Sequence, residues 1–442
     1  MATEVVFHER IARRVSSPPL RVAVLTIGCK LNQAESEAIA GELSAAGCRV
    51  TDRAGPADAF VINTCAVTHV AERKARHLVR FARRLSPDAR IIVTGCCAET
   101  AAAASLSRLG ADVVLGNSEK QQAAGVLLRR ITHASAPPVS GRLRTRSFVK
   151  IQEGCSDVCA FCVVPRTRGR GQSVLAVDIL RTLKRAEADD VKEVVLTGTQ
   201  PGGYGRDCVG GEDLAGLLRL VLYETSIPRI RLSSLQPQEM SPALLGLWED
   251  RRLCQHFHIA LQSGSDAVLA RMRRRYTTGE FAAALEAIRE RLPDAAVTTD
   301  VLVGFPGETD ADFAATRRFC QEAGFAALHV FPFSARPGTL AAKMPDQVSA
   351  ATKRARVQET LGLGEELRDR FLARFQGSVA SVLWEREARG NGEGAWEGLT
   401  GNYIRVLTAS ERPLENRLAM VRLERRQGSG FRGELQPSLE TS

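Results

Sequence analysis

The segment EGCSDVCAFCVVP, residues 153–165, places Cys155, Cys159 and Cys162 in a C-x3-C-x2-C spacing. A loop this compact can direct three thiolates at one iron–sulfur cube and leave its fourth iron without a protein ligand. Zinc normally takes four protein ligands, or three and a water molecule, and no fourth Cys or His follows at a usual zinc spacing. We therefore interpret the segment as the binding loop of an iron–sulfur cluster with one open iron.

Strand-like and helix-length runs alternate on both sides of this loop. Such a pattern predicts an α/β fold, with parallel strands joined by crossover helices and with active-site loops at their carboxyl ends. Only six strands are visible, so we expect a partial (β/α)6 barrel over residues 145–376. The six strand candidates are residues 147–154, 191–198, 228–234, 256–264, 295–307 and 326–334.

A separate βα series precedes the barrel, and it predicts an open parallel α/β sheet over residues 21–133. Its strand candidates are residues 21–28, 57–64 and 89–95, and a helix-like run at 32–47 ends at a glycine. The polar stretch HASAPPVSG, residues 133–141, is the expected linker to the barrel.

Cys29, Cys65 and Cys96 each follow one of these three strands. Because the carboxyl ends of parallel strands meet at one edge of a sheet, where ligands gather, we predict that these cysteines form a second ligand set. The alternative is that each is a small buried hydrophobe. Cys97 competes with Cys96 for the third position, and we prefer Cys96 because it directly follows the glycine that ends the strand.

The last part of the chain, residues 377–436, has a different sequence pattern. Short strand-like runs at 378–387, 402–410 and 417–426 are separated by the glycine-rich turns GNGEG and GLTGN. This pattern predicts a small all-β barrel. The residues beyond about Leu435 are expected to form an untethered tail.

Composition indicates the partners and the cellular location of the protein. The 442 residues carry a formal net charge of +10, which favours an anionic partner such as nucleic acid. No apolar run approaches the roughly 20 residues that span a bilayer, and the N-terminus lacks the apolar core of a signal peptide. We therefore expect a cytoplasmic protein with no membrane partner, in which disulfides are rare.

The remaining cysteines and the histidines show no ligand spacing. We expect structural roles for Cys48, Cys208, Cys254 and Cys320. His256 and His258 alternate along one strand, and we interpret them as packing residues rather than metal ligands.

In these features the chain resembles the methylthiotransferases of the radical S-adenosylmethionine superfamily, and the resemblance covers nearly its whole length. It includes the N-terminal three-cysteine domain, the C-x3-C-x2-C barrel and a terminal TRAM-like barrel. Further matching motifs are PRTRGRGQS, LTGTQ, RLSSLQP, LQSGSD, RMRRRYT and TDVLVGFPGET.

Within the family, the form GCKLNQAESE at residues 28–37 resembles the subgroup that acts on N6-threonylcarbamoyladenosine beside the tRNA anticodon. Lys30, Asn32, Gln33 and Glu35 fit that form. The chain departs from the family pattern at Cys97, where an aromatic residue is common, and at Gln236, where a glutamate is common. The loop TGTQPGGYG is a further variant.

The resemblance implies two [4Fe-4S] clusters and S-adenosylmethionine as cofactors. Cys155, Cys159 and Cys162 would hold the cluster that reduces S-adenosylmethionine, which yields a radical able to take hydrogen from C2 of adenine at position 37. Cys29, Cys65 and Cys96 would hold the cluster that carries the sulfur for transfer. It also implies tRNA as partner and a reductant protein as electron donor. Plausible contacts to S-adenosylmethionine are Thr197, Gly198, Ser233, Ser234, Gln262, Ser263, Gly304, Gly307 and Glu308.

Two arginine groups and three aromatic residues are candidates for contact with RNA. Arg166, Arg168 and Arg170 follow the cysteine loop, and Arg273–Arg275 form a second basic run that could meet phosphate. A solvated surface is the alternative for both. In the terminal barrel, bases could stack on aromatic side chains unless those side chains form its core: Trp384, Trp396 and Tyr403.

Three other functions stay open from the sequence. The substrate could be isopentenyl-adenosine tRNA or a ribosomal protein. The GCKLNQ form favours threonylcarbamoyladenosine, and the basic charge counts against the ribosomal protein. A non-catalytic iron–sulfur RNA-binding protein is the third possibility, but a purely structural cluster would be expected to have four protein ligands.

Overall fold

A computed structural model describes residues 19–100, 102–129, 145–208, 211–388 and 394–437. These residues form two compact units that separate near residue 144, with residues 67–69 grouped with the second unit. The expected linker at 133–141 lies outside the described residues, as do most of the GNGEG turn and the end of the expected tail. No helix in the described ranges is long and apolar enough to span a bilayer.

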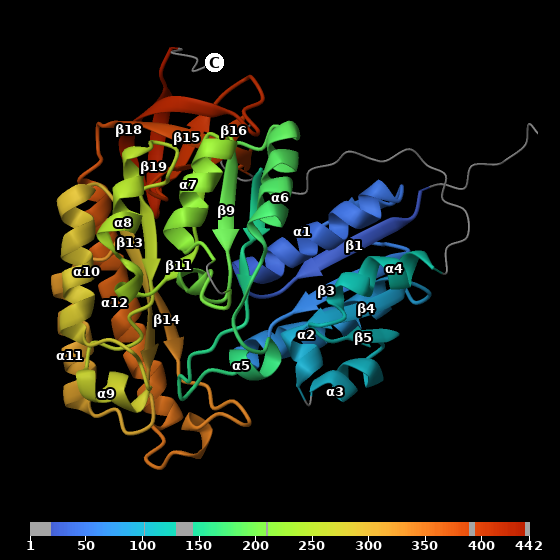
Figure 1. Cartoon of the computed structure of the whole chain (residues 1–442), viewed down its shortest axis with the longest axis horizontal. Helices are drawn as coiled ribbons and strands as arrows, with labels where there is room; N and C mark the ends of the chain where they lie inside the picture. Colours follow the sequence, from blue (N-terminus) through green and yellow to red (C-terminus); the bar gives the residue numbers. More distant parts are fainter. Residues whose placement is uncertain (1–18, 101, 130–144, 209–210, 389–393, 438–442) are drawn as a thin grey trace, which may run out of the picture. The chain divides into compact units, whose positions relative to one another are not determined.

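The N-terminal unit is built on a five-stranded parallel sheet in the order β2-β1-β3-β4-β5. Helices cover both faces (Figure 1) because successive residues of a strand point to opposite sides: Phe60 and Ile62 pack under α2 and α3, and Val61 packs under α1 and α4. The strands are β1 (Arg21–Thr26), β2 (Arg49–Thr51), β3 (Ala59–Thr64), β4 (Arg90–Gly95) and β5 (Val113–Leu115), and the helices are α1 (Lys30–Ala45), α2 (His69–Leu85), α3 (Ala102–Arg108) and α4 (Ala123–Leu128).

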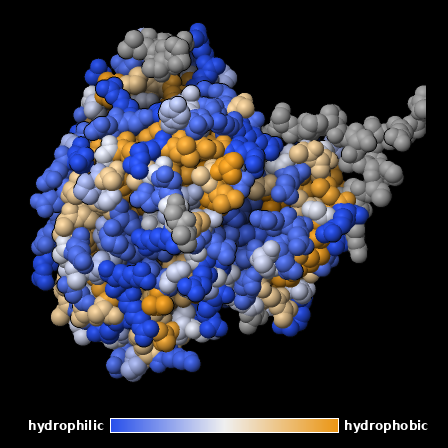
Figure 2. Space-filling model, in the orientation of Figure 1, coloured by the Kyte–Doolittle hydropathy of each residue, from blue (hydrophilic) through white to orange (hydrophobic). Residues whose placement is uncertain are grey.

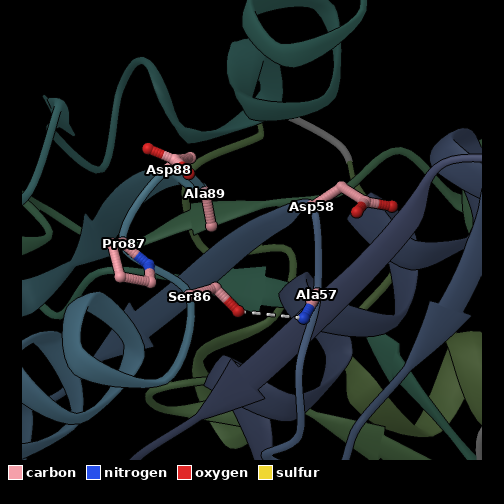
Figure 3. Close-up of a pocket in the computed structure, with 6 residues that line it drawn as sticks. All are labelled: Ala57, Asp58, Ser86, Pro87, Asp88 and Ala89. Carbon is pink, nitrogen blue, oxygen red and sulfur yellow. Dashed lines mark hydrogen bonds between the residues drawn. The ribbon is translucent and has the colours of Figure 1, made fainter.

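This topology confirms the predicted open parallel sheet and adds two short strands, β2 and β5, that the sequence pattern did not reveal. The strand order reverses between β1 and β3, and the crevice at such a reversal is where open α/β sheets bind ligands. At the opposite edge, by the amino ends of β3 and β4, residues 57, 58 and 86–89 line a hollow (Figure 3). There Asp58 is paired with Arg21 at 3.2 Å and Ser86 Oγ accepts a hydrogen bond from the Ala57 amide at 3.3 Å.

The second unit contains six parallel strand positions, as predicted. The sheet β6-β9-β10 continues into the sheet β11-β12-β13-β14 because β10 and β11 follow one another in the chain with a break at Ser233. The strands are β6 (Arg146–Lys150), β9 (Glu193–Thr197), β10 (Arg229–Leu232), β11 (Ser234–Leu235), β12 (His256–Ile259), β13 (Ala296–Val303) and β14 (Ala327–Pro332). Within the described residues β14 does not pair with β6, so the barrel is partial.

Helices line the outer face of this curved sheet and share one large hydrophobic core with it. Local signals define their ends: Thr309 and Asp312 form a capping box at the start of α11, and Gly324 ends that helix with φ 56° in the left-handed region. The helices are α6 (Ala176–Ala188), α7 (Leu214–Glu224), α8 (Pro242–Leu245), α9 (Asp266–Arg271), α10 (Thr278–Arg291), α11 (Asp310–Ala323) and α12 (Ala350–Ala373). The face drawn in Figure 2 is mostly hydrophilic, with apolar residues gathered over α6, where Leu175 and Val177 are exposed.

The C-terminal strands close into a five-stranded barrel in the order β15-β16-β17-β19-β18, which confirms the TRAM-like prediction. The residues 398–400, expected to form a turn, instead end strand β16, in which Ala395 and Trp396 are buried. The strands are β15 (Val379–Glu387), β16 (Ala395–Thr400), β17 (Arg405–Ala409), β18 (Leu418–Gln427) and β19 (Gly430–Leu435).

A buried charge cluster joins this small barrel to the amino ends of the parallel strands. Arg231 donates to Glu193 at 2.8 Å and to the Gly401 carbonyl at 3.0 Å, and Arg229 donates to the Leu399 carbonyl at 2.9 Å. Burial acts to raise the pKa of Glu193, but the surrounding arginines outweigh it and hold that pKa below its ordinary value. The ring of Tyr403 lies between Arg231 and His256, stacked on the imidazole at 4.6 Å.

We predict that Arg231→Met lowers the free energy of unfolding of this unit by about 3 kcal/mol, because it leaves the Glu193 carboxylate buried without its main partner. Urea unfolding followed by tryptophan fluorescence is a suitable measurement, since all three tryptophans belong to this unit. Arg386→Met is the control: Arg386 is 69% exposed in its pair with Glu397, and its loss should cost about 0.5 kcal/mol or less. Equal losses in the two variants would contradict the role given to Glu193.

Candidate functional site

The cysteine loop is closed at its base by two short antiparallel strands. β7 (Gln152–Glu153) pairs with β8 (Gln172–Ser173), and the Cys155 amide donates to the Gly169 carbonyl at 3.1 Å. Gly154 has φ 72°, and a Cβ atom there would lie 2.1 Å from the Arg170 carbonyl oxygen, so only glycine fits. Residues between these strands, including the short helix α5 (Val164–Thr167), therefore form one closed loop at the carboxyl end of β6.

Each of the three cysteines in this loop is half-buried, and two of their thiols contact residues outside the loop. Cys155 Sγ donates to Gln200 Oε1 at 3.3 Å, and Arg274 Nη1 donates to Cys159 Sγ at 3.2 Å. Cys162 is tied to Cys159 by its amide, which donates to the Cys159 carbonyl at 3.1 Å. Three sulfur atoms on one closed loop, with a guanidinium beside them, suit a cluster bound by thiolates.

Burial raises the pKa of Cys155 to about 11 and the pKa of Cys162 to about 12. Hydrogen bonds from the backbone of Asp157 and Val164, and the charge of Arg274, act in the opposite direction. The free thiols of Cys155 and Cys162 are therefore protonated at neutral pH, and binding of iron must displace their protons.

Asp157 is the centre of a polar layer under this loop. Its carboxylate accepts hydrogen bonds from Gln200 Nε2 and Gln236 Nε2, both at 3.1 Å, and pairs with Arg275 at 3.0 Å. Gln236 also accepts from Arg274 Nη2 at 3.2 Å. Gln236, which departs from the family pattern, thus connects Asp157 to the arginine on Cys159.

The arginines near the loop are mainly committed to protein contacts. Arg168 pairs with Glu153 at 2.8 Å, Arg166 donates to the Gly338 carbonyl at 3.3 Å, and Arg274 and Arg275 bind the cysteine loop as described. Arg170 and Arg273 are exposed. The sequence identified both basic runs. Arg166 and Arg275 are exposed as well, but each is held by a protein contact, so the interpretation as phosphate contacts fits Arg170 and Arg273 best.

The variant loop TGTQPGGYG brings Glu239 under the site. Gly202 has no room for a side chain, since a Cβ atom would lie 1.8 Å from the Glu239 carboxyl carbon. Burial raises the pKa of Glu239 to about 7, although its carboxylate accepts a hydrogen bond from the Gln236 amide at 2.9 Å.

Because the folded-state pKa of Glu239 lies above its ordinary value, its stability contribution is complete below about pH 4.5 and is lost as pH rises through 7. We predict that Glu239→Gln raises the melting temperature at pH 8 and that this gain fades towards pH 5. The difference in stability is at most about 3 kcal/mol. Thermal unfolding across this pH range checks it, with the exposed Glu249→Gln as control; a gain independent of pH would count against the assignment.

The residues predicted to contact S-adenosylmethionine fall into two groups. Ser233 Oγ is buried with no hydrogen-bond partner in the described chain, Ser234 is exposed, and Gln262 is partly exposed with φ 67°. Thr199, next to Thr197 and Gly198, also has a buried hydroxyl without a partner among the described residues. These atoms lie at strand ends and remain available to a bound molecule.

The second group is engaged in holding loops. Ser263 is fully buried, with its hydroxyl 3.2 Å from Thr316 Oγ1. Glu308 accepts a hydrogen bond from the Gly304 amide and another from Arg356 Nη1 at 2.7 Å, which fastens the GFPGE turn to α12. Gly304 and Gly307 both have positive φ, which a turn between a strand and a helix can require of glycine. The Glu308 Oε1 atom has no partner in the described residues.

In the N-terminal unit, the predicted cysteines end three adjacent strands. Cys29 follows β1, Cys65 follows β3 and Cys96 follows β4. A Cβ atom at Gly28 would lie 2.9 Å from Cys65 Cβ, and one at Gly95 would lie 2.4 Å from the carbonyl oxygen that precedes Cys65. The three cysteines are therefore brought to one edge, at the reversal of strand order.

Cys97 has a separate role. Its thiol is fully buried and donates to the Cys65 carbonyl at 2.9 Å, and burial raises its pKa to about 12. The thiol thus braces β3 against the turn after β4. This geometry favours Cys96 as the ligand.

The GCKLNQAESE motif contributes to the same edge. Asn32 Nδ2 donates to the Thr64 carbonyl at 2.9 Å and to Asn63 Oδ1 at 3.1 Å, while Cys29 Sγ donates to Asn32 Oδ1 at 3.3 Å. Glu35 forms a buried ion pair with Lys120 at 2.5 Å. Asn32 and Glu35 hold the strand ends together.

The structure confirms some of the predictions for the remaining cysteines, aromatic residues and histidines and contradicts others. Cys48, Cys254 and Cys320 are buried as expected, but Cys208 is exposed. Trp384 and Trp396 form the core of the terminal barrel, so the prediction that bases stack on these two side chains is wrong. Tyr403 contacts Arg231 and His256. His256 is a packing residue as expected, whereas His258 contacts Asp300.

Comparison with known proteins gives the class of this fold. The family model of the radical SAM superfamily matches residues 149–320, and that of the uncharacterized protein family UPF0004 matches residues 21–116. The fold is similar to that of the radical S-adenosylmethionine methyltransferase TsrM from Kitasatospora setae, with a TM-score of 0.54 and 13% identity over 73% of this chain and 77% of that chain. The cysteine loop on a partial barrel is thus part of a radical SAM domain.

Relatives that match most of the chain define the family within this class. The threonylcarbamoyladenosine tRNA methylthiotransferase MtaB of Bacillus subtilis is 34% identical over 91% of this chain and 93% of its own length. The MtaB of Chlamydia pneumoniae is 36% identical over 82% and 86%. The tRNA-2-methylthio-N(6)-dimethylallyladenosine synthase of Methylobacillus flagellatus is 34% identical over 94% and 99%. The chain belongs to the radical SAM methylthiotransferase family, whose members use S-adenosylmethionine and [4Fe-4S] clusters, and the predicted resemblance is confirmed.

Proposed function

We propose that this protein is a tRNA methylthiotransferase that converts N6-threonylcarbamoyladenosine at position 37 to its 2-methylthio derivative. The observation that carries the proposal is the family membership, at 34% identity over nine-tenths of the chain, combined with a closed three-cysteine loop at the carboxyl end of a partial barrel. The GCKLNQAESE form favours the threonylcarbamoyl substrate over the dimethylallyl one.

In this proposal Cys155, Cys159 and Cys162 hold one [4Fe-4S] cluster. When bound, the cluster supplies the electron that cleaves S-adenosylmethionine. Arg274 places a positive charge beside Cys159, while Gln200 and Asp157 fix the loop so that the thiols keep their direction. These contacts orient the ligands from outside, as partners of metal ligands commonly do.

S-adenosylmethionine would bind across the strand ends nearest this loop. Support comes from the buried Ser233 hydroxyl, which has no partner among the described residues, the exposed Ser234 and the backbone at Thr197 and Gly198. Gln262 would contact the same molecule from the turn after β12. Ser263, Gly304, Gly307 and Glu308 then shape the pocket by holding its turns.

A second [4Fe-4S] cluster is proposed for Cys29, Cys65 and Cys96, where it would carry the sulfur to be transferred. Their position at the ends of three adjacent strands supports a shared ligand, and the hydrogen bond of the Cys97 thiol to the Cys65 carbonyl supports Cys96 over Cys97. The amide of Asn32, bonded to the backbone near Cys65, keeps two of the ligands in register.

The choice between Cys96 and Cys97 can be tested by iron content. We expect anaerobically purified Cys96→Ala protein to lose about four of roughly eight irons per chain, because one cube loses a ligand, and Cys97→Ala to keep them. Iron and sulfide analysis of the two variants is the measurement, and Cys48→Ala, which removes a buried thiol elsewhere in the same unit, is the control. Loss of iron only in the Cys97 variant would reverse the assignment.

The terminal barrel is proposed to hold tRNA by charge. Arg405, Arg422, Arg425 and Arg432 are exposed on β17, β18 and β19, and Arg425 lies directly opposite Arg432. Such a surface suits contact with phosphate. A cytoplasmic location and a protein reductant are consistent with this chemistry and are part of the proposal.

The substrate is tested by mass analysis of tRNA nucleosides from a strain that lacks this gene. We expect the 2-methylthio derivative of N6-threonylcarbamoyladenosine to disappear and its precursor to accumulate, and the gene with Cys155→Ala to fail to restore it. Loss of the isopentenyl derivative instead would assign the protein to the other tRNA class. Unchanged tRNA together with an unmodified ribosomal protein would assign the protein to the class that acts on a ribosomal protein. Unchanged modification of both the tRNA and the ribosomal protein would favour a non-catalytic role.

A further inference from the structure

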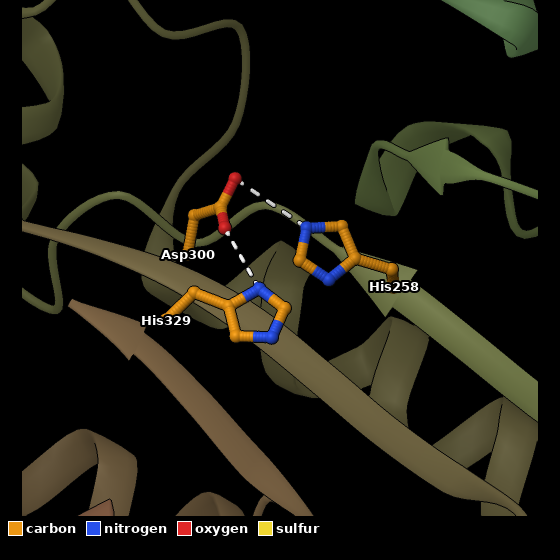
Figure 4. A group of neighbouring side chains, drawn as sticks. All are labelled: His258, Asp300 and His329. Carbon is orange, nitrogen blue, oxygen red and sulfur yellow. Dashed lines mark ion pairs between the residues drawn. The ribbon is translucent and has the colours of Figure 1, made fainter. Parts of the chain in front are cut away.

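Three neighbouring strands of the partial barrel bring two histidines and an aspartate together (Figure 4). His258 is on β12, Asp300 on β13 and His329 on β14, and Asp300 is the register partner of His329. His258 Nε2 lies 3.4 Å from Asp300 Oδ2, and His329 Nδ1 lies 3.4 Å from Asp300 Oδ1. The two imidazole rings are stacked at 5.2 Å between centroids.

The group points to the inner face of the barrel. Along the same strands Phe257, Ile259, Val297 and Val301 belong to the core shared with the outer helices. Because side chains of a strand alternate between faces, His258 and Asp300 must point the other way. Access remains from that side, since the Asp300 side chain is 28% exposed and that of His329 is 53% exposed.

Thr298 holds the innermost imidazole in place. Its hydroxyl lies 3.0 Å from His258 Nδ1, so the Nε2 atom of the same ring is turned towards Asp300. A hydroxyl can accept from a protonated Nδ1, which leaves the Nε2 lone pair for a ligand. Histidines that bind metals usually have such a partner on the second ring nitrogen.

We propose that His258, Asp300 and His329 bind one divalent first-row transition-metal ion of the zinc class on the inner face of the barrel. The three candidate ligand atoms all lie within 4.8 Å of one another. Metal bonds of about 2.0–2.2 Å to imidazole nitrogen and carboxylate oxygen place neighbouring ligand atoms about 3.4 Å apart. His258 Nε2 lies at this distance from Asp300 Oδ2, and His329 Nδ1 lies at this distance from Asp300 Oδ1, so each carboxylate oxygen faces one imidazole. Two imidazoles and one carboxylate are a donor set that suits zinc and its neighbours rather than magnesium or calcium.

Three protein ligands leave part of the coordination sphere open towards the interior. A carboxylate suits this open position, because a divalent ion bound by Asp300 and two neutral imidazoles keeps a net positive charge that attracts an anionic ligand. On the basis of the proposed function, the carboxylate of the threonyl group on the substrate base would fill this position. The site would then distinguish a threonylcarbamoyl group from a dimethylallyl group, which has no oxygen.

Zinc content of the anaerobically prepared holoenzyme tests the site directly. After removal of loose metal with a chelator, the protein is incubated with zinc chloride, passed through gel filtration, and analysed for zinc and iron in the same sample. We expect one zinc ion per chain with unchanged iron. Asp300→Asn and His329→Asn should bind zinc at least about tenfold more weakly, and Thr298→Val about 10- to 100-fold more weakly.

His77→Asn is the matched control, because it removes an imidazole on α2, outside this unit, and should leave zinc binding unchanged. His329 is half-exposed, so its substitution is the variant least able to disturb folding, and constant iron content shows that the cluster sites are intact. Absence of zinc from the wild-type protein, or equal zinc in the wild type and in both ligand variants, would overturn the proposal.

The ligand of the open position is tested by calorimetry with nucleosides. Zinc should raise the affinity of the wild-type holoenzyme for N6-threonylcarbamoyladenosine at least tenfold and leave that for adenosine unchanged, and His329→Asn should abolish this gain. Zinc binding without that gain would overturn the substrate ligand alone. The site proposal stands or falls on metal content, whereas the proposed function stands or falls on the tRNA nucleosides.

Discussion

One buried carboxylate, Glu193, at the start of β9, holds the second unit together by its interactions with arginines of the two neighbouring strands, β6 and β10. Arg231 donates to it directly, and Arg229 and Arg146 lie within 3.7 and 3.9 Å. The same arginines reach across to the terminal barrel, where Arg146 pairs with Glu385 at 2.6 Å. Removing several charges from water is costly unless each is paired, so the two barrels stabilise one another's charges. This closed end leaves the carboxyl ends of the strands as the open end.

Asp157 organises the open end by similar physics. It is a buried carboxylate that accepts from Gln200 and Gln236 and pairs with Arg275, and through Gln236 it is linked to the arginine on Cys159. The strand ends contribute amides here instead of several arginines. These two neutral donors and the single guanidinium of Arg275 satisfy the carboxylate, while Arg274 is the arginine that contacts a thiol, that of Cys159. A loop fixed in this way loses little entropy when it takes up a ligand.

Local patterns were sufficient to predict the six long parallel strands, because each is a hydrophobic run of strand length. The positions of the six candidate ligand cysteines were equally readable, because each cysteine comes shortly after such a run. The strands β2 and β5 were missed because three residues carry too little pattern. Gln200, Asp157 and Arg274 were not identified as a group, since their association depends on strand packing between residues far apart in sequence. The association of His258 with Asp300 and His329 was not predicted for the same reason, because the two partners lie on β13 and β14.

The contacts of the GCKLNQAESE motif change what that motif can mean. Asn32 donates to the carbonyl of Thr64, the last residue of β3, and Glu35 is buried against Lys120, so these residues set the geometry of the cysteine edge. A buried residue that holds a ligand edge cannot itself touch the side chain of a substrate base. Asn32 and Glu35 therefore mark a subgroup through its architecture, whereas Lys30 and Gln33 of the same motif are partly exposed. Within the partial barrel, accessible polar groups with directional chemistry include Ser234, Gln262 and the His258–Asp300–His329 group, and of these only the last carries an ionised side chain beside two imidazoles.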